Sequence, residues 1–297
     1  MMKRLSLVIF LPLFFYGMPF LATINAAESI QVFVSILPQK YFVEKIGRKR
    51  VVVSVMVKPG ANPATYEPKP SQMKALSMAK IYFAIGVPFE KAWLKKIATT
   101  NPNMVVVHTE QGIEKRTMRT QHRHKSGKAF KDHHEIKDPH IWLSPALVIL
   151  QARNILEAMS NLDPIYAHIY RSNYKKFAEE IIQLDTEIMN LFSKKGDKVE
   201  FMVFHPAWGY FAQAYGLEQI PVEIEGKKPK PADLRHLIKH AKEKDIRAIF
   251  VQPQFSAQSA RTIAKAIEAE IVFSDPLALN WADNLQRVAE KFSEALR

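Results

Sequence analysis

The chain has no cysteine and few glycines, and each shortage removes a class of function. Without a thiol, the 297 residues can form no disulfide bond, present no cysteine nucleophile and offer no cysteine for lipid attachment at a mature N-terminus. Only ten glycines are present, and none forms the GxGxxG or GxxxxGK motif that binds phosphate groups at a helix N-terminus. Nucleotide binding is therefore not expected.

Motifs of hydrolytic enzymes are also missing. A zinc hydrolase needs an activated water and a general base. His134 and Glu135 are not followed by the second histidine of HExxH, and no GxSxG motif occurs. We expect a protein that is not an enzyme, with a zinc-dependent hydrolase as the least favoured alternative.

The net charge of +13 could attract nucleic acid or anionic lipid. The lysines are nevertheless spread along the chain, many of them beside glutamates, and no basic motif interleaved with aromatic residues is visible. We expect no nucleic-acid partner and a soluble, monomeric protein.

Residues 1–26 resemble a secretory signal peptide. Lys3 and Arg4 precede an uncharged apolar run from Leu5 to Leu21, and small residues follow up to a cleavage site near Ala26. An uncleaved membrane anchor is the alternative, although the run is at the short limit for a span. We expect export to a bacterial periplasm.

The rest of the chain alternates short apolar strands with helices, which predicts an α/β fold with mostly parallel sheets. Its length favours two lobes, which we place at 27–162 and 195–297. Helical patterns cover Gln39 to Ile46, Ser71 to Ala79 and a segment around Tyr210. The expected strands are Ile30 to Ile36, Val51 to Val57, Ile81 to Ile85, Met104 to Val107, Phe201 to Phe204, Ile220 to Ile224, Ala248 to Val251 and Ile271 to Phe273.

Between the lobes, residues 163–194 form one long helical pattern. Its apolar positions recur every three or four residues, as expected for one face of an α-helix; they are Phe177, Ile181, Leu184, Ile188 and Leu191. A helix is stiffer than a flexible linker, so it predicts two lobes held at a nearly fixed angle.

Polar residues that directly follow strands are candidate ligands, because open α/β sheets bind ligands beyond the carboxyl ends of their strands. His205 follows FMVF, and Asp275 follows IVFS. The Pro-rich loop from Lys58 to Pro68 follows another strand. Each feature also has an ordinary structural explanation, since a lone histidine is often a core or capping residue and Asp before Pro often starts a turn.

Five of the ten histidines fall between residues 122 and 140, and imidazole is the commonest metal ligand. Four of them belong to a charged loop, residues 116–137, that we expect to be disordered; they are His122, His124, His133 and His134. The loop either collects metal as an auxiliary site or is a solvated insert. His140 ends the run in DPHIWLSP, where the chain becomes apolar.

Several motifs together resemble the zinc-type periplasmic metal-binding receptors of bacterial ABC importers. They occur in the expected order over nearly the whole mature chain: SILPQKYFVEKIG, VKPGANPATYEPKPSQM, DPHIWLSP, FHPAWGYFAQAYGL, EIEGKKPKPADL, VQPQFS and FSDPLA. The resemblance implies two α/β lobes joined by a long rigid helix, with a metal ion bound in the cleft between them. It also implies that His140, His205 and Asp275 are ligands.

The fourth ligand position of that family does not match. A histidine precedes Thr-Tyr-Glu-Pro in the family's pattern, whereas this chain has Ala64 there, which has no donor atom. Water, Glu67 or a loop histidine could complete the coordination, or the site could be weak. We expect Tyr66, Trp142 and Trp208 to pack around the ligands and keep water out.

Two imidazoles and one carboxylate favour zinc over manganese. We therefore predict a high-affinity periplasmic zinc receptor that delivers the ion to an ABC permease in the inner membrane. A manganese or iron receptor of the same fold and a metal-dependent adhesin remain alternatives.

Overall fold

The computed structural model describes residues 29–118, 137–193, 199–223, 229–256 and 258–296. The expected signal peptide and the loop histidines His122, His124, His133 and His134 lie outside these residues. Within the described residues, no helix is both long and apolar enough to cross a membrane.

Each lobe contains a parallel four-stranded sheet, as predicted. The N-terminal sheet has the order β2-β1-β3-β4, and the C-terminal sheet has the equivalent order β6-β5-β7-β8. The strands are β1 Ile30–Val34, β2 Val51–Val55, β3 Ile81–Ala84, β4 Val105–His108, β5 Val199–Val203, β6 Leu217–Pro221, β7 Ala248–Val251 and β8 Glu270–Phe273.

All eight expected strands are present, but several boundaries differ. The strand expected at Ile220 to Ile224 is β6, which begins at Leu217 and ends at Pro221. β6 is an edge strand, and beyond its end the Val222 N–H still donates to the Val203 carbonyl at 2.7 Å. Val222 is buried in the core beyond the strand.

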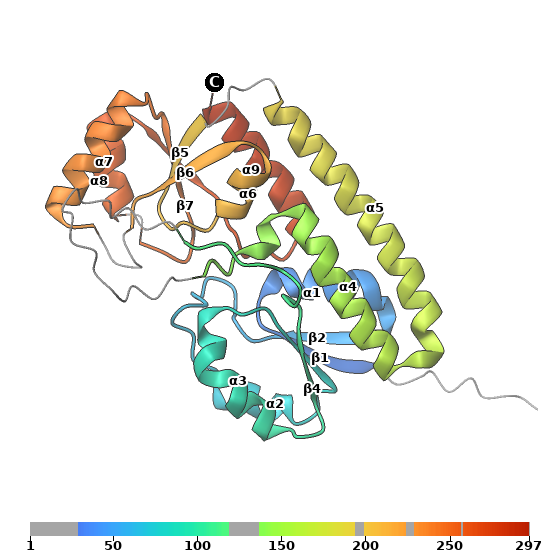
Figure 1. The fold of residues 1–297 in the computed structure, drawn as a ribbon. Coiled ribbons are helices and arrows are strands. Elements are labelled where there is room, and N and C mark those ends of the chain that lie inside the picture. Colours follow the sequence, from blue (N-terminus) through green and yellow to red (C-terminus); the bar gives the residue numbers. More distant parts are fainter. Residues whose placement is uncertain (1–28, 119–136, 194–198, 224–228, 257, 297) are drawn as a thin grey trace, which may run out of the picture.

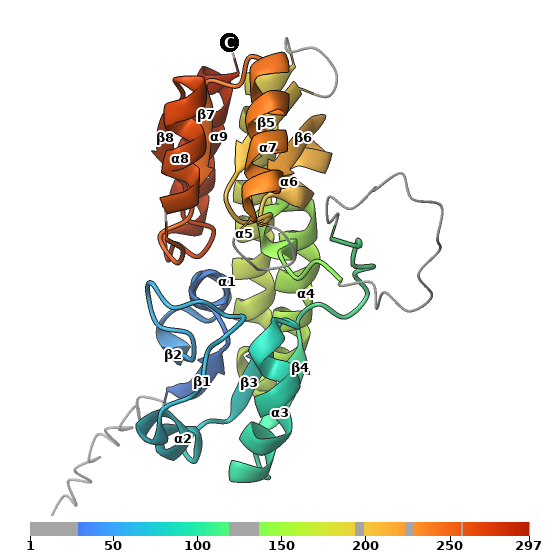
Figure 2. The same ribbon diagram turned by 90° about the vertical axis from the view of Figure 1, so that its left-hand side faces the viewer.

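Helices cover the sheets and connect the lobes (Figures 1 and 2). Four of them, α2, α3, α4 and α7, begin with proline, whose fixed φ suits the first helical turn. The helices are α1 Leu37–Gly47, α2 Pro70–Leu76, α3 Pro88–Thr100, α4 Pro145–Leu162, α5 Ala167–Phe192, α6 Gly209–Ala214, α7 Pro231–Glu243, α8 Gln258–Ile267 and α9 Trp281–Ala295, with short 3₁₀ helices η1 Arg48–Arg50, η2 Ile141–Leu143 and η3 Pro164–Tyr166.

The long helix α5 runs along both lobes, as the sequence predicted (Figure 1). Its 26 residues pack against α1 and α4 of the N-terminal lobe and against α9 at the C-terminus. Four of the five predicted stripe residues are buried, while Leu191 is half-buried and Phe192 takes the buried position at the helix end. The apolar stripe therefore faces the protein core over the whole helix.

Two tryptophans connect the lobes through hydrogen bonds in the core. The indole N–H of Trp142 donates to the carbonyl of Pro276 at 2.7 Å, and the indole N–H of Trp281 donates to the carbonyl of Trp142 at 2.7 Å. The Trp281 ring also packs edge-on against Phe42. One hydrophobic cluster thus includes residues of both lobes.

Candidate metal centre

A cavity of about 250 Å³ lies between the lobes, where the carboxyl ends of both sheets face each other. In such folds this is the usual place for a ligand. The lining comes from both lobes: Asn62, Pro63, Ala64, Gly86, Val87, Pro88, Lys91, Met118, Lys137, Pro139, His140 and Trp142 on one side, and His205, Pro206, Pro221, Glu223, Gln254, Phe255, Pro276 and Leu277 on the other.

His140 is held in a single orientation by Asp138. Its ring Nδ1–H donates to Asp138 Oδ1 at 2.8 Å, and its backbone N–H donates to the same oxygen at 3.0 Å. Asp138 is 1% exposed and His140 is 8% exposed. Burial lowers the pKa of His140, so its imidazole is neutral at neutral pH. Nδ1 is engaged, which leaves Nε2 as the atom for a metal ion.

His205 has the same arrangement in the other lobe. It follows β5, and its Nδ1–H donates to Glu223, which follows the neighbouring strand β6 and is 5% exposed. Gln252 holds the backbone of His205 from both sides, because its side chain accepts from the His205 N–H at 3.0 Å and donates to the His205 carbonyl at 2.8 Å. The ring stacks on Phe255 with centroids 4.6 Å apart.

The two imidazoles meet in the cavity. Their ring centroids are 5.2 Å apart, with the ring planes at 70°. Each ring is oriented by a buried carboxylate on Nδ1, the arrangement found around histidines that bind metal through Nε2. The structure therefore brings together His140 and His205 from separate lobes.

Asp275 lies beside this pair without joining it. Its Oδ1 accepts from Gln254 Nε2 at 2.8 Å and from the Leu277 N–H at 2.9 Å. Leu277 lines the cavity and Asp275 does not. Among the described residues, no three His, Asp or Glu side chains converge closely enough to hold a metal ion. A three-ligand site that includes Asp275 therefore stays a prediction.

Ala64 lines the cavity at the position where the family pattern has a histidine. Its N–H donates to Asn62 Oδ1 at 2.8 Å, which fixes the loop, and its methyl group offers no donor atom. Glu67 is exposed and lies outside the residues that line the cavity. The role of Glu67 as a substitute ligand also stays a prediction.

The three aromatic residues expected around the ligands occupy different places. Trp142 contacts His140 with ring centroids 5.2 Å apart and lines the cavity. Tyr66 packs on Phe89 and donates its hydroxyl to Gln72 at 2.6 Å. Trp208 packs on Phe211 and Phe292 in the C-terminal core. Of the three, only Trp142 is among the lining residues.

The loop expected at 116–137 is anchored at the cavity. Thr117 and Lys137 pair in an antiparallel bridge, and Lys137 lines the cavity. The backbone N–H of Arg116 donates to the Tyr210 hydroxyl at 3.0 Å, and its guanidinium donates to the Gly209 carbonyl. Met118 and Lys137, one on each side of the loop, are therefore both lining residues of the cavity.

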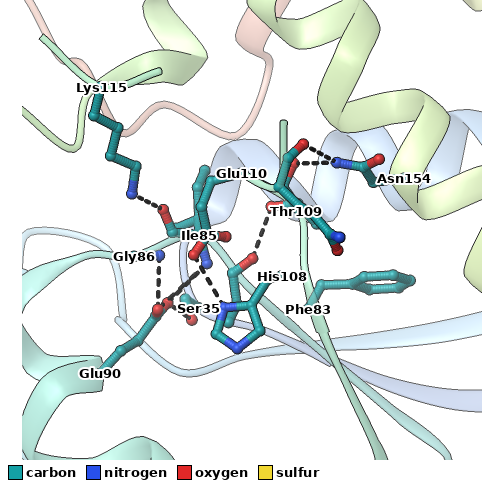
Figure 3. Close-up of polar contacts among 12 residues, drawn as sticks. Ser35, Phe83, Ile85, Gly86, Glu90, His108, Thr109, Glu110, Lys115 and Asn154 are labelled. Carbon is teal, nitrogen blue, oxygen red and sulfur yellow. Dashed lines mark hydrogen bonds and ion pairs between the residues drawn. The ribbon is translucent and has the colours of Figure 1, made fainter. Parts of the chain in front are cut away.

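A second polar cluster supports the cavity wall at Gly86 (Figure 3). The buried carboxylate of Glu90 accepts from the Gly86 N–H at 2.7 Å, the Ile85 N–H at 3.0 Å and the Ser35 hydroxyl. Lys115 Nζ donates to the Ile85 carbonyl at 3.0 Å. Gly86 has a φ of +80°, a backbone conformation that residues with a side chain rarely adopt. Glycine is therefore strongly favoured at this point of the wall.

Asp138 and Glu223, the carboxylates that orient the two histidines, were not among the residues predicted from the sequence. Asp138 precedes His140 by two residues in DPH, a spacing that allows one carboxylate to bind both the ring and the backbone of the histidine. Glu223 could have been found as an acidic residue just beyond the end of a strand. Its pairing with His205 depends on β5 and β6 being neighbours.

Comparisons with known proteins agree with this geometry. The chain is 26% identical over 250 residues to the high-affinity zinc uptake system protein ZnuA of Bacillus subtilis, covering 83% of this chain and 78% of the relative. A crystal structure of ZnuA matches with a TM-score of 0.84 and 40% identity, covering 91% of this chain and 100% of that one. A zinc-bound ZnuA deletion mutant matches with a TM-score of 0.82 and 41% identity, covering 90% and 98%.

A more distant neighbour shares the fold alone. The laminin-binding protein of Streptococcus agalactiae, described as having adhesin and metal transporting activity, matches with a TM-score of 0.78 at 22% identity, covering 91% of this chain and 100% of that one.

The family identified from the sequence motifs is confirmed, and its members are receptors for metal transport, not enzymes. The family model describes a periplasmic zinc-uptake component and matches residues 32–295. The chain therefore belongs to the family of periplasmic zinc-uptake complex component A proteins.

Proposed function

We propose that this protein binds one zinc ion in the interlobe cavity through Nε2 of His140 and Nε2 of His205 and delivers it to the permease of an ABC importer. The observation that carries the proposal is the facing pair of imidazoles, each oriented by its own buried carboxylate. Burial lowers the pKa of His140, so its neutral imidazole can bind a metal ion without first losing a proton.

Asp275 completes the proposed protein ligand set. It is the strand-end carboxylate of the family pattern, and Pro276 and Leu277 beside it already line the cavity. Binding would require its side chain to turn from Gln254 and the Leu277 N–H toward the imidazoles. Two nitrogens and one oxygen favour zinc over manganese, which prefers a site richer in oxygen.

Titration of the metal-free protein with zinc and with manganese tests the site. We expect one tight zinc ion per chain and weaker manganese binding. His140→Ala, His205→Ala and Asp275→Asn should each weaken zinc binding at least tenfold. His240→Ala is the matched control, because His240 pairs with Glu200 on the C-terminal lobe away from the cavity lining. Unchanged zinc affinity in both cavity histidine variants would refute the site.

In the cell, the protein acts as a periplasmic monomer together with an inner-membrane permease. Its signal peptide is cleaved near Ala26. Cell fractionation and N-terminal sequencing of the exported protein test the location. Deletion of the gene should lower zinc uptake in zinc-poor medium, and the His205→Ala variant should fail to restore it. Recovery of the protein mainly on the cell surface would favour the adhesin alternative.

A further inference from the structure

Helices α2 and α3 form a strongly basic surface on the N-terminal lobe, which we call the α2–α3 face. Between residues 68 and 103 the chain has six lysines and a single acidic residue, Glu90. Glu90 is 4% exposed and accepts from the backbone N–H groups of Ile85 and Gly86 (Figure 3), so it leaves the surface without a negative charge. All six lysines are exposed: Lys69, Lys74, Lys80, Lys91, Lys95 and Lys96.

The α2–α3 face lies on the side of the N-terminal sheet that the long helices leave uncovered. The steps from β2 to β3 and from β3 to β4 run in one direction along the sheet, and the step from β1 to β2 runs in the other. Because such crossovers are right-handed, α2 and α3 lie on one side of the sheet and α1 lies on the opposite side. α1 packs there against α4 and α5 (Figures 1 and 2).

The lysines of this face are available to a partner from outside the protein. The lysine salt bridges found among the described residues lie outside the face and involve Lys40, Lys45, Lys239 and Lys244. In α3, Lys91 and Lys95 are one turn apart, a spacing at which like charges repel each other. An extended negative surface would relieve this repulsion along both helices.

Two apolar side chains lie among the lysines. Met78 is 71% exposed. Trp93 is half-buried, and Lys96 Nζ lies 4.6 Å from the centroid of its ring. Tryptophan is favoured where an apolar region meets water, and a lysine can bury its carbon chain while its ammonium group stays hydrated. Lysines combined with exposed apolar and aromatic side chains are typical of surfaces that lie on a lipid bilayer.

We propose that the α2–α3 face binds the anionic phospholipid headgroups of the inner membrane. The six lysines supply the attraction to the negatively charged surface, and Met78 and Trp93 contact the lipid between the headgroups. Lys91 also lines the cavity, so the face begins at the cavity edge. The inference rests on the proposed location of the protein but not on its zinc site, and the metal-free protein should bind lipid equally well.

Co-sedimentation with lipid vesicles tests the α2–α3 face. The exported protein is mixed with vesicles of phosphatidylglycerol and phosphatidylcholine, or with vesicles of phosphatidylcholine alone. We expect binding only to the mixed vesicles, and we expect added salt to weaken it because salt screens the charges.

A combined variant removes four charges from the face and keeps Lys91: Lys74→Gln, Lys80→Gln, Lys95→Gln and Lys96→Gln. It should weaken lipid binding about tenfold or more, because each lysine near an anionic bilayer contributes to the attraction. A matched control removes four charges from exposed positions outside the face: Lys175→Gln, Lys176→Gln, Lys242→Gln and Lys265→Gln. The control should stay within about threefold of wild type, since distant charges are screened. Thermal melting verifies that both variants are folded.

Fluorescence identifies the side of the protein that contacts the lipid. Of the four tryptophans, three are at most 2% exposed; they are Trp142, Trp208 and Trp281. Lipid that carries a nitroxide on its headgroup should therefore quench mainly Trp93 in the bound protein. Trp93→Phe should still bind the vesicles and should lose most of the quenching.

Four results would overturn the proposal. The first is no binding to the mixed vesicles, or equal binding to phosphatidylcholine alone. The second is equal weakening by the face variant and its control, since net charge alone would then explain the attraction. The third is bound protein whose Trp93 is not quenched. The fourth is retention of poly-L-glutamate without retention of vesicles, which would assign the face to an acidic protein partner. Zinc titration of the face variant should give the wild-type affinity, so failure of lipid binding can be distinguished from failure of the proposed function.

Discussion

Replacing Asp138 should weaken zinc binding although Asp138 is not itself a proposed ligand. Its buried carboxylate accepts from the backbone N–H and from the ring Nδ1–H of His140, at 3.0 and 2.8 Å. Asp138→Ala removes both bonds, so that the ring can rotate and its Nε2 becomes less basic. Asp138→Asn keeps an acceptor oxygen and removes the charge, so its effect should be smaller.

The magnitude follows from the loss of one charged hydrogen bond. Such a bond contributes about 1.5 to 3 kcal/mol, and about 1.4 kcal/mol corresponds to a factor of ten in affinity. We therefore expect Asp138→Ala to weaken zinc binding about 10-fold to 100-fold, the range typical of residues that orient metal ligands. Glu223→Ala should give a similar loss through His205.

Competition between the protein and a chromogenic zinc chelator near neutral pH measures the effect. Urea denaturation in the absence of metal establishes that each variant is folded. Asp245→Asn is the control, because Asp245 pairs with Arg247 on the exposed surface. If folded Asp138→Ala binds zinc within twofold of wild type, the carboxylate does not prepare His140 for the metal, and the reasoning is wrong.

Four further predictions follow from other parts of the molecule. Trp281→Phe removes the indole donor to the buried Trp142 carbonyl and should lower the free energy of unfolding by about 1 kcal/mol, measured with urea; an unchanged value would mean that the hydrogen bond contributes no stability. Burial raises the pKa of Glu90 above its ordinary 4.5, so the folded state holds a proton that the unfolded state releases, and stability should decline as pH rises above 4.5 through the folded-state pKa. Glu90→Gln should flatten that part of the urea-midpoint profile, and an identical slope in both proteins would contradict the assignment. Zinc should dissociate on dialysis from about pH 8 to about pH 5 as protons compete for the imidazoles, although the lowered pKa of His140 delays its protonation; constant affinity over that range would contradict this. Deletion of residues 118–135 should remove weak additional zinc equivalents and leave the cavity site intact, and unchanged total stoichiometry would exclude a collecting role for the loop.

The fold was largely predictable because its signals are local. Short apolar runs predicted all eight strands, and the stripe from Phe177 to Ile188 predicted α5. The predicted ends of several strands were wrong, because tertiary contacts determine where a strand ends. Val222 is as apolar as a strand residue but lies buried beyond the end of β6.

The site was predictable only in part because its geometry is not local. His140 and His205 are recognisable from the sequence because histidine is a common metal ligand. The structure places their rings in contact. The role of Glu223 depends on which strands are neighbours, and the outward position of Glu67 depends on the turn of its loop. Neither the strand order nor the orientation of this loop produces a periodic pattern in the sequence.

The Trp142 side chain connects the two lobes at the proposed site. Its ring contacts His140, and its indole N–H donates to the carbonyl of Pro276, directly after Asp275. Any motion that separates the two lobes at the site has to break this hydrogen bond and expose a buried indole. Release of a metal ion by separation of the lobes would therefore break this bond together with the one from Trp281 to the Trp142 carbonyl.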